Sequence, residues 1–539
     1  MTDAAQAVTV HDVLVVGAGF SGLYMLHYAR DVLGFDAVGL EAGDGPGGTW
    51  YWNRYPGARC DSESFYYCYT FSDELLREWD WTSRYPEQPE ILRYLEFVAD
   101  RLDLRRSFRF STRVTSARWD ASASRWLVTT DAGTTLAATY LVTAVGCLSA
   151  ANVPTIPGLE DFAGEWFHTG RWPQHGVDFS GKRVAQIGTG STGIQAAPVI
   201  AETAQHLYVF QRTPNYTVPA RNRPMGRDEW VAIKSNYDEV RRLTRESFAG
   251  FPYTPTNRSA LEVADDERTS IYESLWEEGG FKFLWGSFFD LMFNEAANDT
   301  AAEFIRQKIR STVTDPAVAE ALCPTDHPYG SKRPPIDTDY YATFNRDNVT
   351  LVDLTAAPIE RITREGIETS EASYDVDTIV FATGFDAVTG PLLRMHITGR
   401  DGLTLADKWA DGPRSYLGLQ VAGFPNLFTI TGPGSPSVLT NMPTSIEQHV
   451  EWIGGCLDHL RSLGSPTIEA SLEAEDAWTE HAAQISSMGL FHKANSWYLG
   501  ANIPGKKRVF LPYVGGLANY RNRCDEIAAA SYEGFLIPA

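Results

Sequence analysis

Apolar positions along the chain follow two spacings that predict different secondary structures. Short apolar runs at residues 13–16 and 184–187 lead into glycine-rich turns, and a helical spacing of apolar residues follows each turn. A strand, a tight turn and a helix in this order are typical of parallel-sheet units. Residues 228–248 and 301–313 are instead amphipathic with many charges, which predicts helices. The pattern therefore predicts an α/β fold with a helical insertion.

The first turn contains the spacing Gly17-x-Gly19-x-x-Gly22. Glycines at these positions let the backbone approach a pyrophosphate, and the N–H groups at the helix N-terminus stabilise its charge. The next predicted strand, AVGLEAG, contains Glu41, which lies 24 residues after Gly17. A carboxylate there accepts hydrogen bonds from ribose hydroxyls and repels a 2′-phosphate. The first turn therefore predicts a site for FAD or NAD.

A second turn repeats this arrangement with one change of charge. It contains Gly188-x-Gly190-x-x-Gly193, and the following strand, LYVFQRTPN, contains Arg212, again 24 residues after the first glycine. A base in place of the acid is what a 2′-phosphate requires. Two such signatures in one chain predict two Rossmann-like domains, with FAD bound by the first and NADPH by the second.

Two later apolar strands indicate how the domains are connected. Residues 140–149 and 377–386 each run into a turn of small residues, as strands that return toward a bound dinucleotide do. The segment between 216 and 330 interrupts the second domain. The predicted division is an FAD-binding domain at 1–150 and 389–539, an NADP-binding domain at 151–215 and 331–388, and a helical insertion at 216–330.

Three further segments carry a resemblance to a known family. The linker-like stretch FAGEWFHTGRWP (162–173) has the form FxGxxxHxxxWP, and residues 48–61 have the form GxWxxxxYPGxxxD. With SKRPPIDTDYY, which begins at residue 331, they make the chain resemble the type I Baeyer–Villiger monooxygenases, a class B flavoprotein group that includes phenylacetone, steroid and cyclohexanone monooxygenases. The resemblance implies NADPH- and O2-dependent oxidation of a cyclic, aryl or polycyclic ketone to an ester or lactone. It also implies a C4a-peroxyflavin anion that needs a permanent positive charge and protection from water.

The resemblance assigns roles to particular residues. Arg333 is expected to stabilise the peroxyflavin together with retained NADP+, because an arginine stays charged at neutral pH, and Asp61 is expected to orient Arg333. The residues expected to bind FAD are Gly17, Gly19, Ser21, Gly22, Glu41, Trp50, Asp61, Tyr67 and Val114. Those expected to bind NADP are Gly188, Gly190, Ser191, Thr192, Gly193, Arg212, Thr213, Lys332 and Trp497.

Several of these residues have ordinary structural alternatives. Lys332 and Arg333 would also suit a solvated basic turn, Asp61 would suit a helix N-cap, and Trp497 would suit a core position. Met442 and Leu439 lie in the segment 432–445, which resembles the longer active-site loop of the phenylacetone and steroid enzymes. They are expected to line the ketone pocket, although a methionine is also a common packing residue.

His168 titrates near neutral pH and so invites a catalytic role. It lies between the two predicted dinucleotide units, and proton management is already assigned to Arg333, the flavin and NADP+. A domain-coupling role, with the ring bonded to backbone, is the expectation.

Composition narrows the other possibilities. The chain of 539 residues has a net charge of −22, which disfavours nucleic acid and anionic membranes as partners. The six cysteines show no CxxC spacing, so neither a metal site nor a redox dithiol is predicted. The N-terminus lacks the pattern of a signal peptide. We expect a cytoplasmic monomer or weak homo-oligomer; an N- or S-oxygenating flavin monooxygenase is the alternative enzyme, and an electron-transfer reductase or a dinucleotide-binding sensor is the alternative class.

Overall fold

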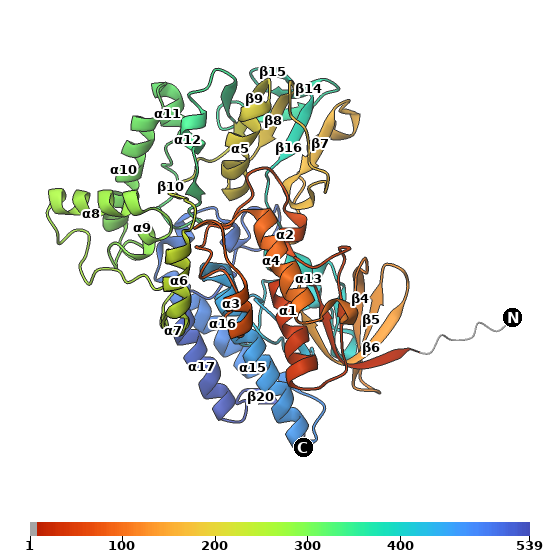
Figure 1. Cartoon of the computed structure of the whole chain (residues 1–539). Coiled ribbons are helices and arrows are strands. Elements are labelled where there is room, and N and C mark those ends of the chain that lie inside the picture. The colour runs from red at the N-terminus through yellow and green to blue at the C-terminus, as the bar shows by residue number, and fades with distance from the viewer. Residues whose placement is uncertain (1–7, 539) are drawn as a thin grey trace.

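The first glycine-rich turn belongs to a sheet built from both ends of the chain. A computed structural model describes residues 8–538 and shows two lobes, with the first sheet in the lower one (Figure 1). Strand β1 lies between β2 and β6 and is parallel to both, with Val13 opposite Ala37 and Tyr140. The order is β17-β4-β5-β6-β1-β2-β3, and β18 also pairs with β6. The bounds are β1 (Thr9–Val16), β2 (Ala37–Leu40), β3 (Phe108–Arg109), β4 (Val114–Asp120), β5 (Arg125–Thr130), β6 (Thr135–Thr143), β17 (Ile397–Thr398) and β18 (Leu427–Thr429).

The second glycine-rich turn belongs to a separate sheet in the upper lobe. Its strands are all parallel, in the order β12-β9-β8-β16-β7. The chain enters this sheet before the helical insertion and returns to it afterwards, because β12 and β16 follow the insertion. The bounds are β7 (Glu165–His168), β8 (Arg183–Ile187), β9 (His206–Gln211), β12 (Val349–Asp353) and β16 (Thr378–Phe381).

Alternate residues of the central strands pack on opposite faces of each sheet. Val13 and Val15 contact one hydrophobic cluster, whereas Leu14 and Val16 contact another. A parallel sheet covered on both faces needs such a continuous apolar run. The first sheet is mixed, because β5 is antiparallel to both β4 and β6, and the second sheet is fully parallel. The observed α/β architecture, with two sheets whose central strands are parallel, confirms the predicted fold class.

The segment 162–173 contains regular structure that its sequence pattern did not indicate. Residues 165–168 form β7, the edge strand that pairs with β16, and 169–171 form a 3-10 turn. The strand is too short for alternation to be visible, and Trp166 on it is 43% exposed. Its partner lies more than 200 residues later in the chain, so local sequence could not predict the pairing.

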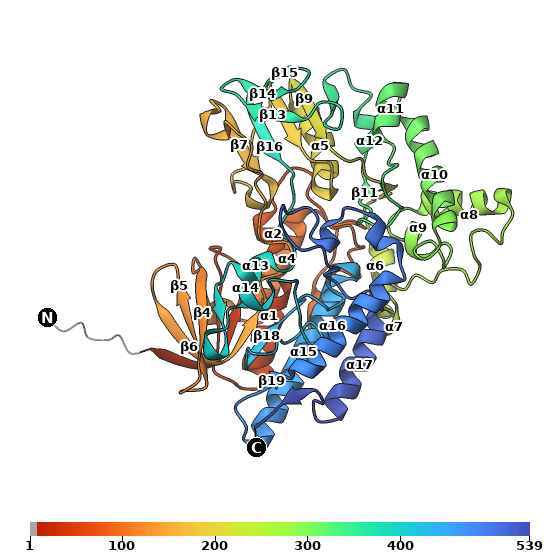
Figure 2. The ribbon, with the colours of Figure 1, turned by 180° about the vertical axis from the view of Figure 1, so that it is seen from behind.

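The remaining elements cover the sheets and connect them. Three small sheets are β10 (Val218–Pro219) with β11 (Ile336–Asp337), β13 (Ile359–Ile362) with β14 (Gly366–Thr369) and β15 (Ser373–Asp375), and β19 (Glu469–Ala470) with β20 (Phe535–Leu536). Helices α15 and α17 lie side by side in the lower lobe in both views (Figure 2). The helices outside the insertion are α1 (Phe20–His27), α2 (Thr49–Trp52), α3 (Asp73–Glu78), α4 (Gln88–Arg101), α5 (Ser191–Thr203), α12 (Tyr340–Thr343), α13 (Gly390–Leu393), α14 (Leu405–Lys408), α15 (Met442–Leu463), α16 (Leu472–Ser487) and α17 (Leu517–Ala529).

The helical insertion contacts both lobes. Its first two helices pack on the lower lobe, where the indole of Trp230 donates to the Trp81 carbonyl and Arg241 pairs with Asp73 at 2.8 Å. The later helices pack beside the upper lobe (Figure 1). The insertion thus connects the two lobes on one side of the molecule. Its helices are α6 (Arg227–Ser235), α7 (Tyr237–Glu246), α8 (Asp265–Glu278), α9 (Lys282–Trp285), α10 (Glu295–Thr312) and α11 (Pro316–Leu322).

The aromatic segment 281–293 lies within this insertion and is largely core. Phe281, Phe283 and Phe288 are buried, whereas Phe289 and Phe293 are exposed. Within residues 8–538, no helix is both long and apolar enough to span a bilayer.

Candidate active site

The two glycine-rich turns are built in the same way, each against the end of a neighbouring parallel strand. Gly17 has φ +107°, and a Cβ on it would lie 2.5 Å from the Ala144 carbonyl oxygen after β6. Gly188 has φ +113°, and its Cβ would lie 2.4 Å from the Ala382 oxygen after β16. A side chain is therefore excluded at both positions, and each turn is held at the carboxyl end of its sheet.

The third glycine of each signature has a packing function. A Cβ on Gly22 would lie 1.7 Å from the Gly17 oxygen, and one on Gly193 would lie 2.2 Å from the Gly188 oxygen. These contacts let α1 and α5 begin directly above their turns. Both helices have a glycine N-cap without a side-chain hydrogen bond, so the first N–H groups remain available to an anion.

Both helix N-termini open into one cavity. Its volume is about 2150 Å³, roughly twice the upper end of about 1,000 Å³ for ordinary small-molecule sites. The cavity is lined by elements of both sheets, by the loop after α2 and by the N-terminal end of α15. A space of this size and shape fits two dinucleotides that meet between the lobes.

Glu41 lies at the end of β2 and faces the first turn. Its carboxylate oxygens accept hydrogen bonds from the N–H groups of Ala18 and Gly43, each at 2.7 Å. Burial raises the pKa of this carboxyl, while those two hydrogen bonds oppose the rise. Each oxygen retains a second acceptor site, which suits a ribose hydroxyl.

The second turn has cations at the corresponding place. Arg212, which follows β9, is exposed and lines the cavity together with Lys332. Burial lowers the pKa of the Lys332 ammonium; Asp326, 3.7 Å away, opposes that effect and nearby Arg212 adds to it. Two cations this close have the arrangement that a 2′-phosphate needs. Asp326 was not predicted from the sequence.

Arg333 and Asp61 form a two-pronged ion pair in the cavity wall. The Arg333 Nε and Nη2 atoms donate to the two Asp61 carboxylate oxygens at 3.0 and 2.8 Å. Burial works to lower the pKa of Arg333, but the charge of Asp61 outweighs it and the pKa is raised. Asp61 is not a helix N-cap, because residues 61–72 form turns and bends rather than a helix. Arg333 is half-buried and does not belong to a solvated basic turn.

Three further groups fix the position of Arg333. Its Nη1 donates to the Val438 carbonyl at 2.9 Å, and its guanidinium carbon lies 4.8 Å from the ring centre of Phe281. Tyr498 is buried beside it, and the Arg333 charge opposes the rise that burial causes in the pKa of that phenol. The sequence pattern did not indicate these three contacts.

Most of the predicted site residues line the cavity, and four do not. Gly22 and Gly193 lie behind it, as described. Leu439 packs against the hydrophobic core instead, and its neighbours Val438 and Thr440 line the cavity. His168 also lies outside the wall. The predicted residues that do line it are Gly17, Gly19, Ser21, Glu41, Trp50, Asp61, Tyr67, Val114, Gly188, Gly190, Ser191, Thr192, Arg212, Thr213, Lys332, Arg333, Met442 and Trp497.

His168 ends β7 and is almost fully buried. Its Nδ1 accepts a hydrogen bond from the Gly170 N–H at 3.0 Å, and its ring packs edge-on against Phe385. Burial lowers its pKa to about 4. A ring that is neutral at working pH and uses one nitrogen for the backbone fits a structural role. Four residues later, Trp172 donates through its backbone N–H to the Trp52 carbonyl at 3.4 Å, so the segment also contacts the end of α2.

These features define a flavoprotein with one site for FAD and a second for a 2′-phosphorylated nicotinamide dinucleotide. Residues 10–229 match the family model described as flavin-binding monooxygenase-like. A Baeyer–Villiger monooxygenase of Pseudooceanicola batsensis is 46% identical over 97% of this chain and 95% of its own. The phenazine N-monooxygenase PhzNO1 of Lysobacter antibioticus is 44% identical over 98% of this chain and 97% of its own.

A solved structure of steroid monooxygenase bound to NADP is 52% identical, with a TM-score of 0.94 over 98% of this chain and 99% of its own. The chain belongs to the Baeyer–Villiger monooxygenases. It is an enzyme that uses FAD and NADPH, as related structures in complex with FAD and NADP support.

Proposed function

We propose that this enzyme oxidises larger aryl or polycyclic ketones to esters or lactones with NADPH and O2, and that Arg333 is its central catalytic residue. The observation that carries the proposal is the Arg333–Asp61 pair in the wall of a cavity with two dinucleotide sites. A fixed cation there stabilises negative charge on activated oxygen without supplying a proton.

The glycine turns and the helix N-termini without side-chain caps support FAD and NADPH as ligands. The glycines let each turn lie close against the end of the neighbouring strand, and the first N–H groups of α1 and α5 remain available to a pyrophosphate. When bound, FAD accepts a hydride from NADPH and activates O2. The N–H groups of α1 and α5 hold the two pyrophosphates, Glu41 holds a ribose, and Arg212 with Lys332 holds the 2′-phosphate. Trp50, Tyr67 and Val114 would contact FAD, and Trp497 would help to retain the nicotinamide cofactor.

Asp61 orients Arg333 and keeps its two-pronged geometry during the reaction. The Val438 carbonyl and the Phe281 ring occupy the other sides of the guanidinium. The proposed chemistry requires that water be kept from the activated oxygen, and Met442 would border the ketone. His168 is proposed to couple the two dinucleotide domains indirectly, because its hydrogen bond from the Gly170 N–H fixes the segment whose Trp172 N–H reaches the Trp52 carbonyl.

Replacing Arg333 by alanine tests the central role. We expect anaerobic reduction of the flavin by NADPH to persist within a few-fold, while ester formation falls by at least 100-fold, about the effect of removing one charge-stabilising donor. Stopped-flow absorbance and product chromatography measure the two steps. Arg183→Ala is the matched control, because Arg183 also grips one carboxylate, that of Asp377, with two nitrogens but lies outside the cavity wall. Ester formation retained in Arg333→Ala would refute the role.

The proposed substrate class rests on the segment 432–445 and on the identity to steroid monooxygenase. This segment brings Val438, Thr440 and Met442 to the cavity. A panel of cyclohexanone, phenylacetone and a 20-oxo steroid, compared by kcat/KM, tests the class. Highest kcat/KM for cyclohexanone would contradict it.

N-oxygenation is the second candidate, because the relative that is 44% identical is a phenazine N-monooxygenase. Incubation with a ketone or a phenazine, each with NADPH and O2, separates the two activities by product. The predicted domain ranges, a cytoplasmic location and a monomeric or weakly oligomeric state remain part of this proposal. Small-angle scattering of the holoenzyme would test the last of these.

A further inference from the structure

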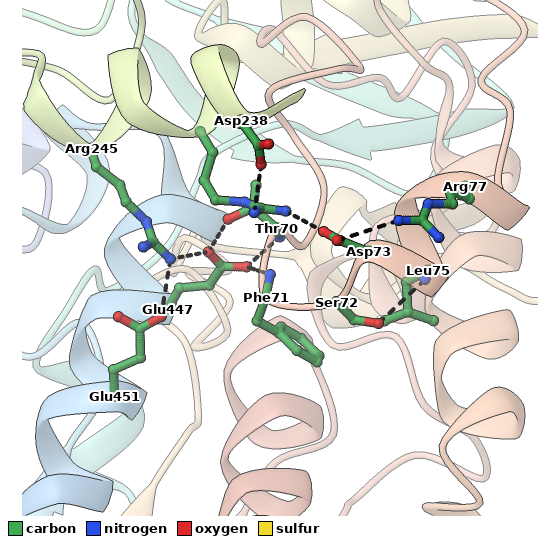
Figure 3. Close-up of polar contacts among 11 residues, drawn as sticks. Thr70, Phe71, Ser72, Asp73, Leu75, Arg77, Asp238, Arg245, Glu447 and Glu451 are labelled. Atoms are coloured by element: carbon green, nitrogen blue, oxygen red, sulfur yellow. Dashed lines mark hydrogen bonds and ion pairs between the residues drawn. The ribbon is translucent and has the colours of Figure 1, made fainter. Parts of the chain in front are cut away.

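A buried carboxyl group on α15 accepts hydrogen bonds from the loop that follows Asp61. Glu447 is 1% exposed. Its Oε1 accepts the N–H groups of Thr70 at 2.5 Å and Phe71 at 3.1 Å, and its Oε2 accepts the Thr70 hydroxyl at 2.5 Å (Figure 3). Three hydrogen bonds from two consecutive residues fix the position of this loop more firmly than packing alone would.

The same helix holds the loop at a second point. The side-chain amide of Asn441, the N-cap residue of α15, donates to the Tyr66 carbonyl at 2.7 Å. The Asn441 backbone N–H donates to the Ala249 carbonyl at 2.8 Å, just beyond α7. Residues 66–71 are therefore fastened at both ends to the first two turns of α15.

Residues 66–71 and the first two turns of α15 contribute to the cavity wall. Tyr67 lies between the two attachment points and lines the cavity, and Asp61 lies five residues before the first of them. On α15, Met442 and Ile446 line the cavity, and Ile446 is adjacent to Glu447. A shift of α15 relative to the loop would change the spacing between the expected ketone wall and the Arg333–Asp61 pair.

Glu447 lies within a larger set of charges. Arg245 on α7 lies 3.9 Å from Glu447 and 3.2 Å from Glu451 (Figure 3). Arg521 on α17 lies 3.6 Å from Glu451. The helical insertion is thus connected to the same carboxylate. Titratable groups near Glu447 also include Tyr24 on α1, and Cys68 and Tyr69 on the loop.

We propose that Glu447 is a positioning residue that sets the geometry of the ketone pocket by fastening residues 70–71 to the wall helix α15. It touches neither cofactor nor substrate and acts through the loop and the helix. The inference rests on the proposed function, since it concerns the pocket in which the ketone is oxidised.

The test is Glu447→Gln in the FAD-loaded full chain. Glutamine keeps the shape and one acceptor oxygen, but it replaces the oxygen that accepts the Thr70 hydroxyl and removes the charge opposite Arg245. We expect the ketone KM to rise at least fivefold and the ester formed per NADPH to fall below half. The anaerobic rate of flavin reduction by NADPH should stay within twofold, because none of the residues expected to bind NADP is a hydrogen-bond partner of Glu447.

A matched control separates positioning from general stability. Glu475 on α16 is also fully buried, accepts the Ala422 N–H at 2.9 Å and pairs with Lys408 at 2.6 Å, but its elements do not line the cavity. Glu475→Gln is expected to lower the unfolding temperature without changing ketone KM or the ester yield per NADPH. Equal kinetic effects from both variants, or none from Glu447→Gln, would refute the proposal.

A second variant covers the case in which Glu447→Gln does not fold. Thr70→Val removes only the hydroxyl donor, and Thr70→Ser retains it. The valine variant should reproduce the rise in KM and the serine variant should restore the original value; identical behaviour of the two would also count against Glu447. If the unaltered enzyme makes no ester from any ketone, the proposed function fails instead, whatever the variants do.

Discussion

At the scale of single residues, Lys332 and Arg212 are expected to discriminate between the nicotinamide cofactors. Removing one charged donor from a phosphate loses about 1.5–3 kcal/mol, which is roughly 10- to 100-fold in binding. Lys332→Gln should therefore raise the KM for NADPH by at least tenfold and change that for NADH by less than twofold. Steady-state kinetics with each cofactor measures both values.

Lys182→Gln is the control for this experiment. Lys182 pairs with Glu165 at 3.0 Å in the same domain but does not line the cavity. Its replacement should leave both cofactor KM values unchanged. An equal rise in the KM values for NADPH and NADH in the Lys332 variant would show that Lys332 does not recognise the 2′-phosphate.

The buried Glu447 carboxyl also predicts a pH dependence of stability. Burial raises its pKa from 4.5 to about 7, although the Thr70 hydrogen bonds oppose the rise. The folded form therefore holds its proton over a range in which the unfolded chain has released it. The stabilisation from this group is fully present below pH about 4.5 and is lost as pH rises through about 7.

Glu447→Gln cannot titrate at this position, so it isolates the effect. The free energy of unfolding of the original protein, relative to that of the variant, should fall by on the order of 3 kcal/mol between pH 4.5 and pH 8. Urea unfolding of both proteins across this range gives the difference. A difference that is constant with pH would show that the carboxyl titrates normally.

At the scale of elements, the glycines at the start of α5 have separable roles. A Cβ on Gly193 would collide with the Gly188 oxygen, whereas one on Gly190 would meet nothing within 4 Å and its φ is ordinary. Gly193→Ala should destabilise the fold by about 1–3 kcal/mol, as overpacking does. Gly190→Ala should keep the unfolding temperature and weaken NADP+ binding, because the new methyl lies where the pyrophosphate approaches.

Thermal unfolding with and without NADP+ distinguishes the two variants. The Gly190 variant should lose most of the shift that the cofactor causes, and the Gly193 variant should already be less stable without it. If the Gly193 variant instead lost the shift caused by NADP+ and the Gly190 variant kept it, the assignment of the pyrophosphate contact to Gly190 would be wrong.

Local signals predicted the dinucleotide elements, because each site is a strand, a turn and a helix that are consecutive in the chain. Gly17, Glu41 and Arg212 could be placed in this way, and the cavity contains all three. The resemblance to a family supplied Arg333 and Asp61, which are 272 residues apart and share no local pattern.

The remaining features depend on contacts between distant segments. Strand β7 needs β16 as a partner, and Phe281 reaches Arg333 from the insertion. The half-buried Leu439 packs beside the core, although its two neighbours line the cavity. Side-chain direction in a loop or a 3-10 turn has no fixed period, so the sequence could not choose between Leu439 and the residues beside it.

At the scale of the whole molecule, neither lobe of the chain is complete in one continuous segment. Helices α15 and α17 contribute Val450, Ile453 and Tyr520 to the core that α1 also enters. A fragment of residues 1–388 should therefore fail to unfold cooperatively and should not retain FAD, whereas the full chain should do both. Calorimetry and the flavin absorbance of the purified fragment provide the test, and co-expression with residues 389–539 should restore both properties if the two pieces can assemble.

The pairing of β18 with β6 has a consequence for how the protein is made on the ribosome. Strand β5 covers residues 135–138 of β6, and Leu427–Thr429 covers residues 141–143 along the same edge. Translation at about 5–20 residues per second leaves the second part of that edge without its partner for roughly 15–60 s. An open strand of Leu-Val-Thr is a site for intermolecular pairing. Slow expression or a chaperone that shields this edge should therefore raise the yield of folded enzyme.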